Sequence, residues 1–200
     1  ASYDVDAGFF NLDSSSSVFD LNGRQLTVND AYISSGYFDD GGGTVTVNGD
    51  LLILSTIDNL ANFTGQVNLA SSGEIGNGNW TNRFNDVQQS AMVTTTLGFD
   101  VIIGGKLMCG VDAQISVGIS GYTLRLYEEP TVNTVTWGGG AGLLTLEFWD
   151  GMGIAGDDYG DCDLFFNGGT NVFSLSGDVT TTGDVYTGTD GFDGRRMTIA

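Results

Sequence analysis

Three segments decide the fold: Phe19-Asp-Leu-Asn-Gly-Arg-Gln-Leu-Thr-Val28, Val45-Thr-Val-Asn-Gly-Asp-Leu-Leu-Ile53 and Val67-Asn-Leu-Ala-Ser-Ser-Gly-Glu-Ile75. In each segment apolar residues two positions apart lead into a glycine-containing turn, and a second apolar run leaves it. A period of two is typical of a β-strand with one buried face. The turn glycines Gly23, Gly49 and Gly73 are spaced by 26 and 24 residues. A recurring interval of this size indicates a repeat architecture.

The Asn-Gly pairs leave two folds open. Asn22-Gly23 and Asn48-Gly49 are typical of two-residue hairpins, because a type I′ turn needs positive φ at both positions. Such hairpins would join two apolar pairs, Phe19 with Leu26 and Val45 with Leu52. They would build an antiparallel jelly roll or β-sandwich, with donor-strand exchange between copies. Asn and Gly also suit the left-handed corners of a parallel β-solenoid, and the glycine spacing favours this second fold.

We therefore expect a single all-β domain over residues 1–200, built as a parallel β-solenoid. Its parts are a terminal strand at 1–12, regular repeats over 18–78 and irregular repeats over 99–200. The chain has 32 Gly and one Pro, which indicates tight turns rather than proline-rich linkers. A hydrophobic content of 40% is enough to bury a core, and no window shows a sustained helical period.

The charge balance excludes some classes of partner. The chain carries 25 acidic and 6 basic residues, for a formal net charge of −19, and has no histidine. A nucleic-acid-binding protein needs a basic surface, so we expect no nucleic-acid partner. We also expect no membrane insertion, because no apolar run reaches the length of a membrane span.

Residues 52–78 resemble the repeats of bacterial autotransporter passenger domains. The resemblance rests on Leu52-Ile-Leu-Ser, Asn62-Phe-Thr-Gly-Gln-Val-Asn68 and Ala70-Ser-Ser-Gly-Glu-Ile75. Thr56 stands where the family pattern has glycine, and the step from Thr-Gly to Val is shorter. The resemblance implies a right-handed parallel β-solenoid displayed on a cell surface, as in adhesins. The repeat has no catalytic residues, so the resemblance assigns no site.

We expect an extracellular protein. The chain begins at Ala1 rather than Met, which fits removal of a secretion signal. Cys109 and Cys162 fit no zinc spacing, and they would form either one disulfide or two buried thiols. Asn62 and Asn79 begin glycosylation sequons.

Acidic turns are the candidate metal sites. The segment Asp157-Asp-Tyr-Gly-Asp-Cys-Asp163 holds four carboxylates within seven residues, beside a glycine. Calcium prefers six to eight oxygen ligands on a flexible turn, so a candidate calcium site consists of Asp157, Asp158, Asp161 and Asp163. The alternative is a solvated acidic turn, since the spacing is not that of an EF-hand.

The sequence favours a non-enzymatic protein. Serine nucleophile catalysis lacks its histidine, and no two glutamates are brought together by the pattern. Glu147 is the glutamate placed within a strand-like segment. A carbohydrate-binding or polysaccharide-cleaving β domain remains the alternative, with Trp80, Trp137 or Trp149 as sugar platforms or as core residues.

The N-terminal segment predicts self-assembly. Its apolar residues alternate with polar ones, as in an edge strand: Tyr3, Val5, Ala7 and Phe9. An exposed strand edge can pair with another copy by main-chain hydrogen bonds. We therefore predict a secreted structural protein, the subunit of a surface fibre, coat or adhesin, with copies of itself and surface glycans as partners. A monomer with docked ends is the alternative.

Overall fold

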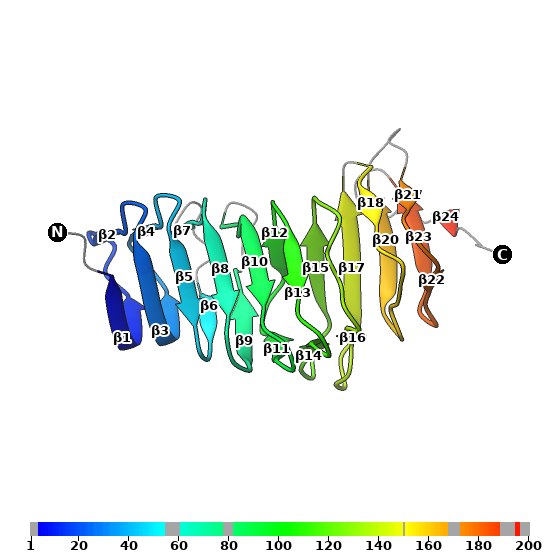
Figure 1. Ribbon diagram of the computed structural model, residues 1–200, viewed down its shortest axis with the longest axis horizontal. Coiled ribbons are helices and arrows are strands. Elements are labelled where there is room, and N and C mark those ends of the chain that lie inside the picture. Colours follow the sequence, from blue (N-terminus) through cyan, green and yellow to red (C-terminus); the bar gives the residue numbers. More distant parts are fainter. Residues whose placement is uncertain are drawn as a thin grey trace.

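The computed structural model describes residues 4–54, 61–77, 82–149, 151–167 and 173–188, and the backbone of 195–196. All of its regular elements are β-strands, and every pairing but the last is parallel. Successive strands lie side by side along the long axis from the N-terminal to the C-terminal end (Figure 1). The fold is a β-solenoid of about 8 turns, which confirms the predicted class and shows that the antiparallel jelly roll is wrong.

The chain visits three faces in a repeating order. The first face contains β1 (Val5–Leu12), β3 (Gln25–Ile33), β5 (Thr44–Val47), β8 (Gln66–Leu69), β10 (Asp86–Gln89) and β13 (Leu107–Cys109). The second contains β6 (Leu51–Ile53), β9 (Gly73–Gly76), β11 (Thr94–Leu97), β14 (Gln114–Val117) and β16 (Thr136–Trp137). The long strand β3 belongs to both, because its first half pairs with β5 and its second half with β6.

The third face runs the length of the molecule. It begins with β2 (Val18–Asp20), β4 (Tyr37–Asp39) and β7 (Ala61–Asn62), and continues with β12 (Val101–Ile103), β15 (Tyr122–Leu126), β17 (Leu144–Trp149), β20 (Asp163–Asn167) and β23 (Val185–Gly188). The last two turns add β18 (Gly153–Ile154) and β19 (Asp157–Asp158), then β21 (Ser174–Leu175) and β22 (Val179–Thr180), and the chain ends with the antiparallel β24 (Arg195–Arg196).

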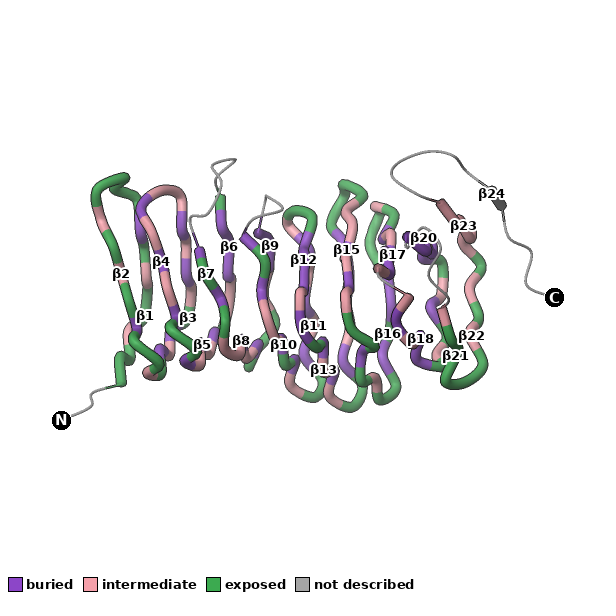
Figure 2. The backbone as a smooth tube through the Cα atoms, turned by 90° about the horizontal axis from the view of Figure 1, so that it is seen from above, coloured by how far each residue is buried: buried purple, intermediate pink, exposed green. Residues whose placement is uncertain are grey.

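Register fixes a buried column of aliphatic side chains on the first face. Leu26, Val45, Val67, Val87 and Leu107 follow one another at steps of 19, 22, 20 and 20 residues, and none is more than 3% exposed. Exposed residues gather mostly at the turns, while buried ones line the strands (Figure 2). Each turn therefore buries its apolar face against the turns before and after it, as solenoids require.

The glycine spacing seen in the sequence compares glycines from two different corners of the solenoid. Gly49 and Gly73 are stacked one turn apart, since a Cβ on Gly73 would lie 2.0 Å from the carbonyl oxygen of Gly49. Gly23 lies at another corner, where it contacts Gly41 of the next turn. The interval from Gly23 to Gly49 therefore joins unlike positions, and the true repeat is nearer 20 residues.

The first Asn-Gly pair turns a corner. Asn22 and Gly23 have φ of 49° and 74°, and the N–H of Arg24 donates to the carbonyl of Leu21 at 3.1 Å. These angles match a type I′ turn, yet the flanking strands enter different sheets. The expected hairpin pairs are both wrong, because Phe19 pairs with Phe38, Leu26 with Val45, and Leu52 with Tyr32.

Carboxylates at the corners join one turn to the next. Asp30 accepts a hydrogen bond from the backbone N–H of Asp50 at 2.9 Å, and Asp50 accepts one from the N–H of Glu74 at 2.8 Å. Asp86 and Asp163 serve later turns in the same way. Part of the acidic composition therefore satisfies backbone donors that a corner would leave unpaired.

Candidate functional site

At one step of the solenoid the parallel ladder is interrupted on two of the three faces, whereas the third face is divided earlier, between β7 and β12. On the first face the ladder reaches Thr131, whose N–H and carbonyl bond to Leu107 and Cys109 of the preceding turn at 2.8 Å. The next strand on that face, β18, pairs with β21 alone, and β19 on the second face pairs with β22 alone. The third face continues without a gap through the β17–β20 pair.

Local sequence explains why the ladder stops here. Pro130, the one proline of the chain, has no N–H to donate at this point. The aromatic rings of Trp137 and Tyr159 are both buried and lie 5.2 Å apart, so they fill the space between the two turns. Side chains therefore connect the two turns on these faces where backbone hydrogen bonds do so elsewhere.

Two side-chain contacts cross the interruption. The indole N–H of Trp137 donates to Oδ2 of Asp157 at 2.7 Å. The carboxylate of Glu129 lies over Gly153, where a Cβ would come within 2.3 Å of Oε2. Gly153 thus lets the Glu129 side chain pass against the backbone of the next turn.

A groove of about 720 Å³ opens at the interruption. It crosses four successive turns, and its lining consists of Lys106, residues 129–132, residues 155–157 and residues 176–178. This size lies within the range of small-ligand sites, which is about 300 to 1,000 Å³. Each turn of a solenoid is also called a rung, and we call this cavity the rung groove.

The rung groove is polar and carries a net negative charge. Its ionisable residues are Lys106, Glu129, Asp157 and Asp178, and Lys106 is the one lysine of the chain. Glu129 and Asp178 are exposed, and neither forms an ion pair with a residue that the structure describes. The sequence prediction identified only Asp157 of these four. Pro130 was the available signal, since a lone proline in a strand-rich chain marks a place where a ladder can end.

Three of the four carboxylates of the predicted calcium site accept hydrogen bonds from different turns. Asp157 accepts from Trp137, Asp158 from Thr180 at 3.0 Å, and Asp163 from the N–H of Asp184 at 2.8 Å. Among the described residues, no group of three or more His, Cys, Asp or Glu side chains is arranged to hold a metal ion. The geometry therefore gives the calcium prediction no support.

Both cysteines are buried and unbridged. Burial raises the pKa of each thiol to about 12, and the charge of Asp157 adds to this effect at Cys109. At Cys162 the charges of Asp161 and Asp163 act in the same direction. Such thiols are protonated and unreactive at neutral pH.

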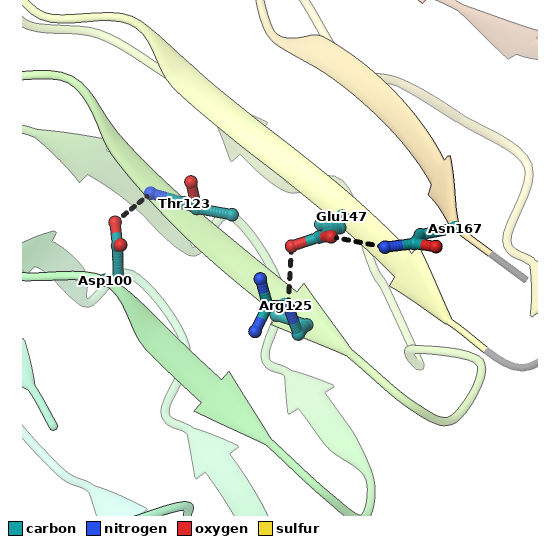
Figure 3. A network of polar contacts seen from close by, with 5 residues as sticks. All are labelled: Asp100, Thr123, Arg125, Glu147 and Asn167. Carbon is teal, nitrogen blue, oxygen red and sulfur yellow. Dashed lines mark hydrogen bonds and ion pairs between the residues drawn. The ribbon is translucent and has the colours of Figure 1, made fainter. Parts of the chain in front are cut away.

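Glu147 lies in a polar network on the third face (Figure 3). On β17 it accepts from the guanidinium Nε of Arg125 on β15 and from Nδ2 of Asn167 on β20, the latter at 3.1 Å. The Arg125 guanidinium also lies 5.1 Å from the centre of the Trp149 ring, which stacks on Tyr127 at 5.7 Å. Both oxygens of the buried Glu147 thus have partners, and the network links three turns.

The remaining predicted residues lie apart from the rung groove. Val5, Ala7 and Phe9 belong to β1, the first strand of the solenoid, and Tyr3 lies outside the described residues. Asn62 is exposed and donates to Asp39 at 3.1 Å, whereas Asn79 and Trp80 lie outside the described residues. No helix among the described segments could cross a membrane.

A comparison of the chain with known protein families, curated proteins and solved structures found no match. The resemblance to autotransporter passenger repeats is therefore supported only at the level of the parallel β-solenoid.

Proposed function

We propose that the protein is a non-enzymatic extracellular structural protein, a subunit of a surface fibre, coat or adhesin that stacks end to end. The observation that carries this proposal is the outer edge of β1. This strand pairs with β3 from Val5 to Leu12 on one side, and the structure describes no partner on the other. A long unpaired strand edge favours pairing with another chain.

The exposed side chains of β1 support the same proposal. Phe9 is 59% exposed and Val5 is 38% exposed, and neither lysine nor proline blocks the edge. At the far end, β21 and β22 likewise have no outer partner among the described residues, and Leu175 is half exposed. Contact between these unlike ends repeats without closing, and such contacts produce filaments.

The mode of assembly differs from donor-strand exchange. β1 already completes the sheet of its own chain, so a neighbouring copy would add to its outer edge. Parallel pairing across the junction would continue the first and second faces of the rod, whereas on the third face β24 already occupies the outer edge of β23. Assembly would then leave the fold of each subunit unchanged.

Light scattering and negative-stain imaging over a range of protein concentrations test this proposal, with and without EDTA. We expect rods that lengthen with concentration in the wild type and discrete monomers in the double variant Val5→Lys/Phe9→Lys. The double variant Met92→Lys/Ile119→Lys adds the same charge at two exposed turn positions far from the ends, and should assemble normally. Monomers of the wild type under all conditions would overturn the proposal, and loss of rods in EDTA alone would show that a divalent cation takes part.

A second candidate is a carbohydrate-binding domain on the third face. The stacked rings of Tyr127 and Trp149 are partly exposed there and could form an aromatic platform. Trp137, by contrast, is buried against Tyr159. Binding to a panel of oligosaccharides that is lost in Trp149→Ala would favour this function over the fibre.

A further inference from the structure

We propose that the rung groove binds an extended peptide segment through a lysine or arginine side chain. The inference is independent of end-to-end stacking, because the groove lies away from β1 and opens on the side of the rod. It rests on an unpaired strand edge, on a cavity at that edge and on the charge of the cavity.

The strand edge supplies the main-chain part of such a site. Thr131 uses its N–H and carbonyl toward the preceding turn, and β18 pairs only with the following turn. Neighbouring residues in a parallel strand point their polar groups to opposite sides, so the carbonyl of Pro130 and the N–H and carbonyl of Val132 face the following turn, and both residues line the groove. An extended peptide can add to such an edge by main-chain hydrogen bonds.

The side chains determine which peptide is favoured. Glu129 and Asp178 come from turns on either side of Gly156 and can accept hydrogen bonds from an ammonium or guanidinium group. Asp157 adds a third carboxylate, although its Oδ2 is already bonded to Trp137. With a net charge of −19, the protein as a whole also attracts cationic segments to a concave acidic site.

Lys106 favours one orientation of a bound peptide over the other. Lys106 lines the same groove as Glu129, Asp157 and Asp178, and the structure describes no ion pair for it. A bound peptide is therefore expected to place its basic side chain near Glu129 and Asp178 and a carbonyl group near Lys106. No aromatic ring lines the groove among the described residues, which favours a peptide over a sugar.

Titration of the whole protein with two capped peptides tests the proposal, using Thr-Val-Lys-Val-Thr and the charge-reversed Thr-Val-Glu-Val-Thr. We expect the lysine peptide to bind at least tenfold more tightly than the glutamate peptide. The double variant Glu129→Gln/Asp178→Asn should weaken lysine-peptide binding at least fivefold.

The matched control is Asp13→Asn/Glu128→Gln, which removes the same charge from exposed positions outside the groove. It should change the affinity by less than twofold. An equal loss in the control would show non-specific attraction to an acidic protein and would overturn the proposal. Absence of binding, or displacement of the peptide by a neutral oligosaccharide at a lower concentration than the peptide itself, would also overturn it.

Discussion

The indole of Trp137 and the carboxylate of Asp157 are joined by a hydrogen bond of 2.7 Å across the step where the ladder is interrupted on two faces. At most other steps of the solenoid, backbone hydrogen bonds connect these faces from turn to turn. At this step a tryptophan and an aspartate perform that role, and the rung groove opens beside them. The pair thus marks both a mechanical junction and the edge of a candidate binding site.

Trp137→Phe tests the junction. The variant keeps an aromatic ring against Tyr159 but leaves Oδ2 of Asp157 without its donor. We expect the free energy of unfolding to fall by about 1.5 to 3 kcal/mol, the usual contribution of a hydrogen bond to a charged group. Urea denaturation measures this change. A free energy of unfolding equal to that of the wild type would show that this hydrogen bond does not stabilise the fold.

The network around Glu147 predicts non-additive effects. Glu147→Leu leaves the largely buried guanidinium of Arg125 without its carboxylate, and should cost about 3 to 5 kcal/mol. The double variant Arg125→Met/Glu147→Leu removes both charges and should cost less than the single one. A double-mutant cycle in urea measures the coupling, and additive losses would contradict the network.

Substitution of Asp40 should destabilise the protein more than substitution of its neighbour Asp39. Its buried carboxylate accepts from the N–H of Gly42, from both the N–H and hydroxyl of Thr64, and from the N–H of Gly65. Asp40→Ala leaves these donors unpaired, so a loss of about 3 kcal/mol or more is expected. Asp39→Ala, at a partly exposed position, should cost less than about 1 kcal/mol. Thermal unfolding of both variants measures the difference.

The thiols predict a loss of stability at high pH. Burial raises the pKa of Cys109 and Cys162 to about 12, compared with 9.0 in an exposed thiol. The folded state therefore holds these protons more tightly than the unfolded chain does. The contribution of the two protonated thiols to the free energy of unfolding is complete below about pH 9 and is lost as the pH rises toward 12. The pKa of Tyr159 is also raised by burial, so this phenol likewise reduces the stability at high pH.

Reaction with a thiol reagent provides the matching measurement. Neither cysteine should react at pH 8 in the folded protein, and two equivalents should react in urea. Rapid labelling of the folded protein would contradict the burial of the thiols. No reaction in urea without reductant, with two equivalents after reduction, would instead show a disulfide between them.

The sequence predicted the fold class because strand periodicity and turn chemistry are local properties. Val45 and Val47 alternate with threonines, and this alternation places both valines in the core. The same local signals could not distinguish a corner from a hairpin, since Asn22-Gly23 has type I′ angles in either case. Only the pairing of Phe19 with Phe38 settles that question, and it depends on residues far apart in the chain.

The rung groove was harder to predict from the sequence, because its residues also come from distant parts of the chain. Glu129 and Asp178 are separated by more than two turns of sequence, and only the stacking of those turns brings them to one groove. The acidic segment from Asp157 to Asp163 was conspicuous in the sequence, but three of its four carboxylates bond to neighbouring turns in different directions. Proximity in the sequence therefore suggested a single site at the acidic segment, whereas the groove residues are too far apart in the sequence to be grouped in this way.

Fibre diffraction from oriented, concentrated protein tests the proposed end-to-end stacking most directly. If β1 of one copy adds to the last turn of the next, strands lie across the fibre axis throughout. The pattern should then show a meridional reflection at about 4.8 Å, the spacing of paired strands. Oriented fibres with that reflection on the equator, or a protein that forms no oriented assembly, would contradict the account.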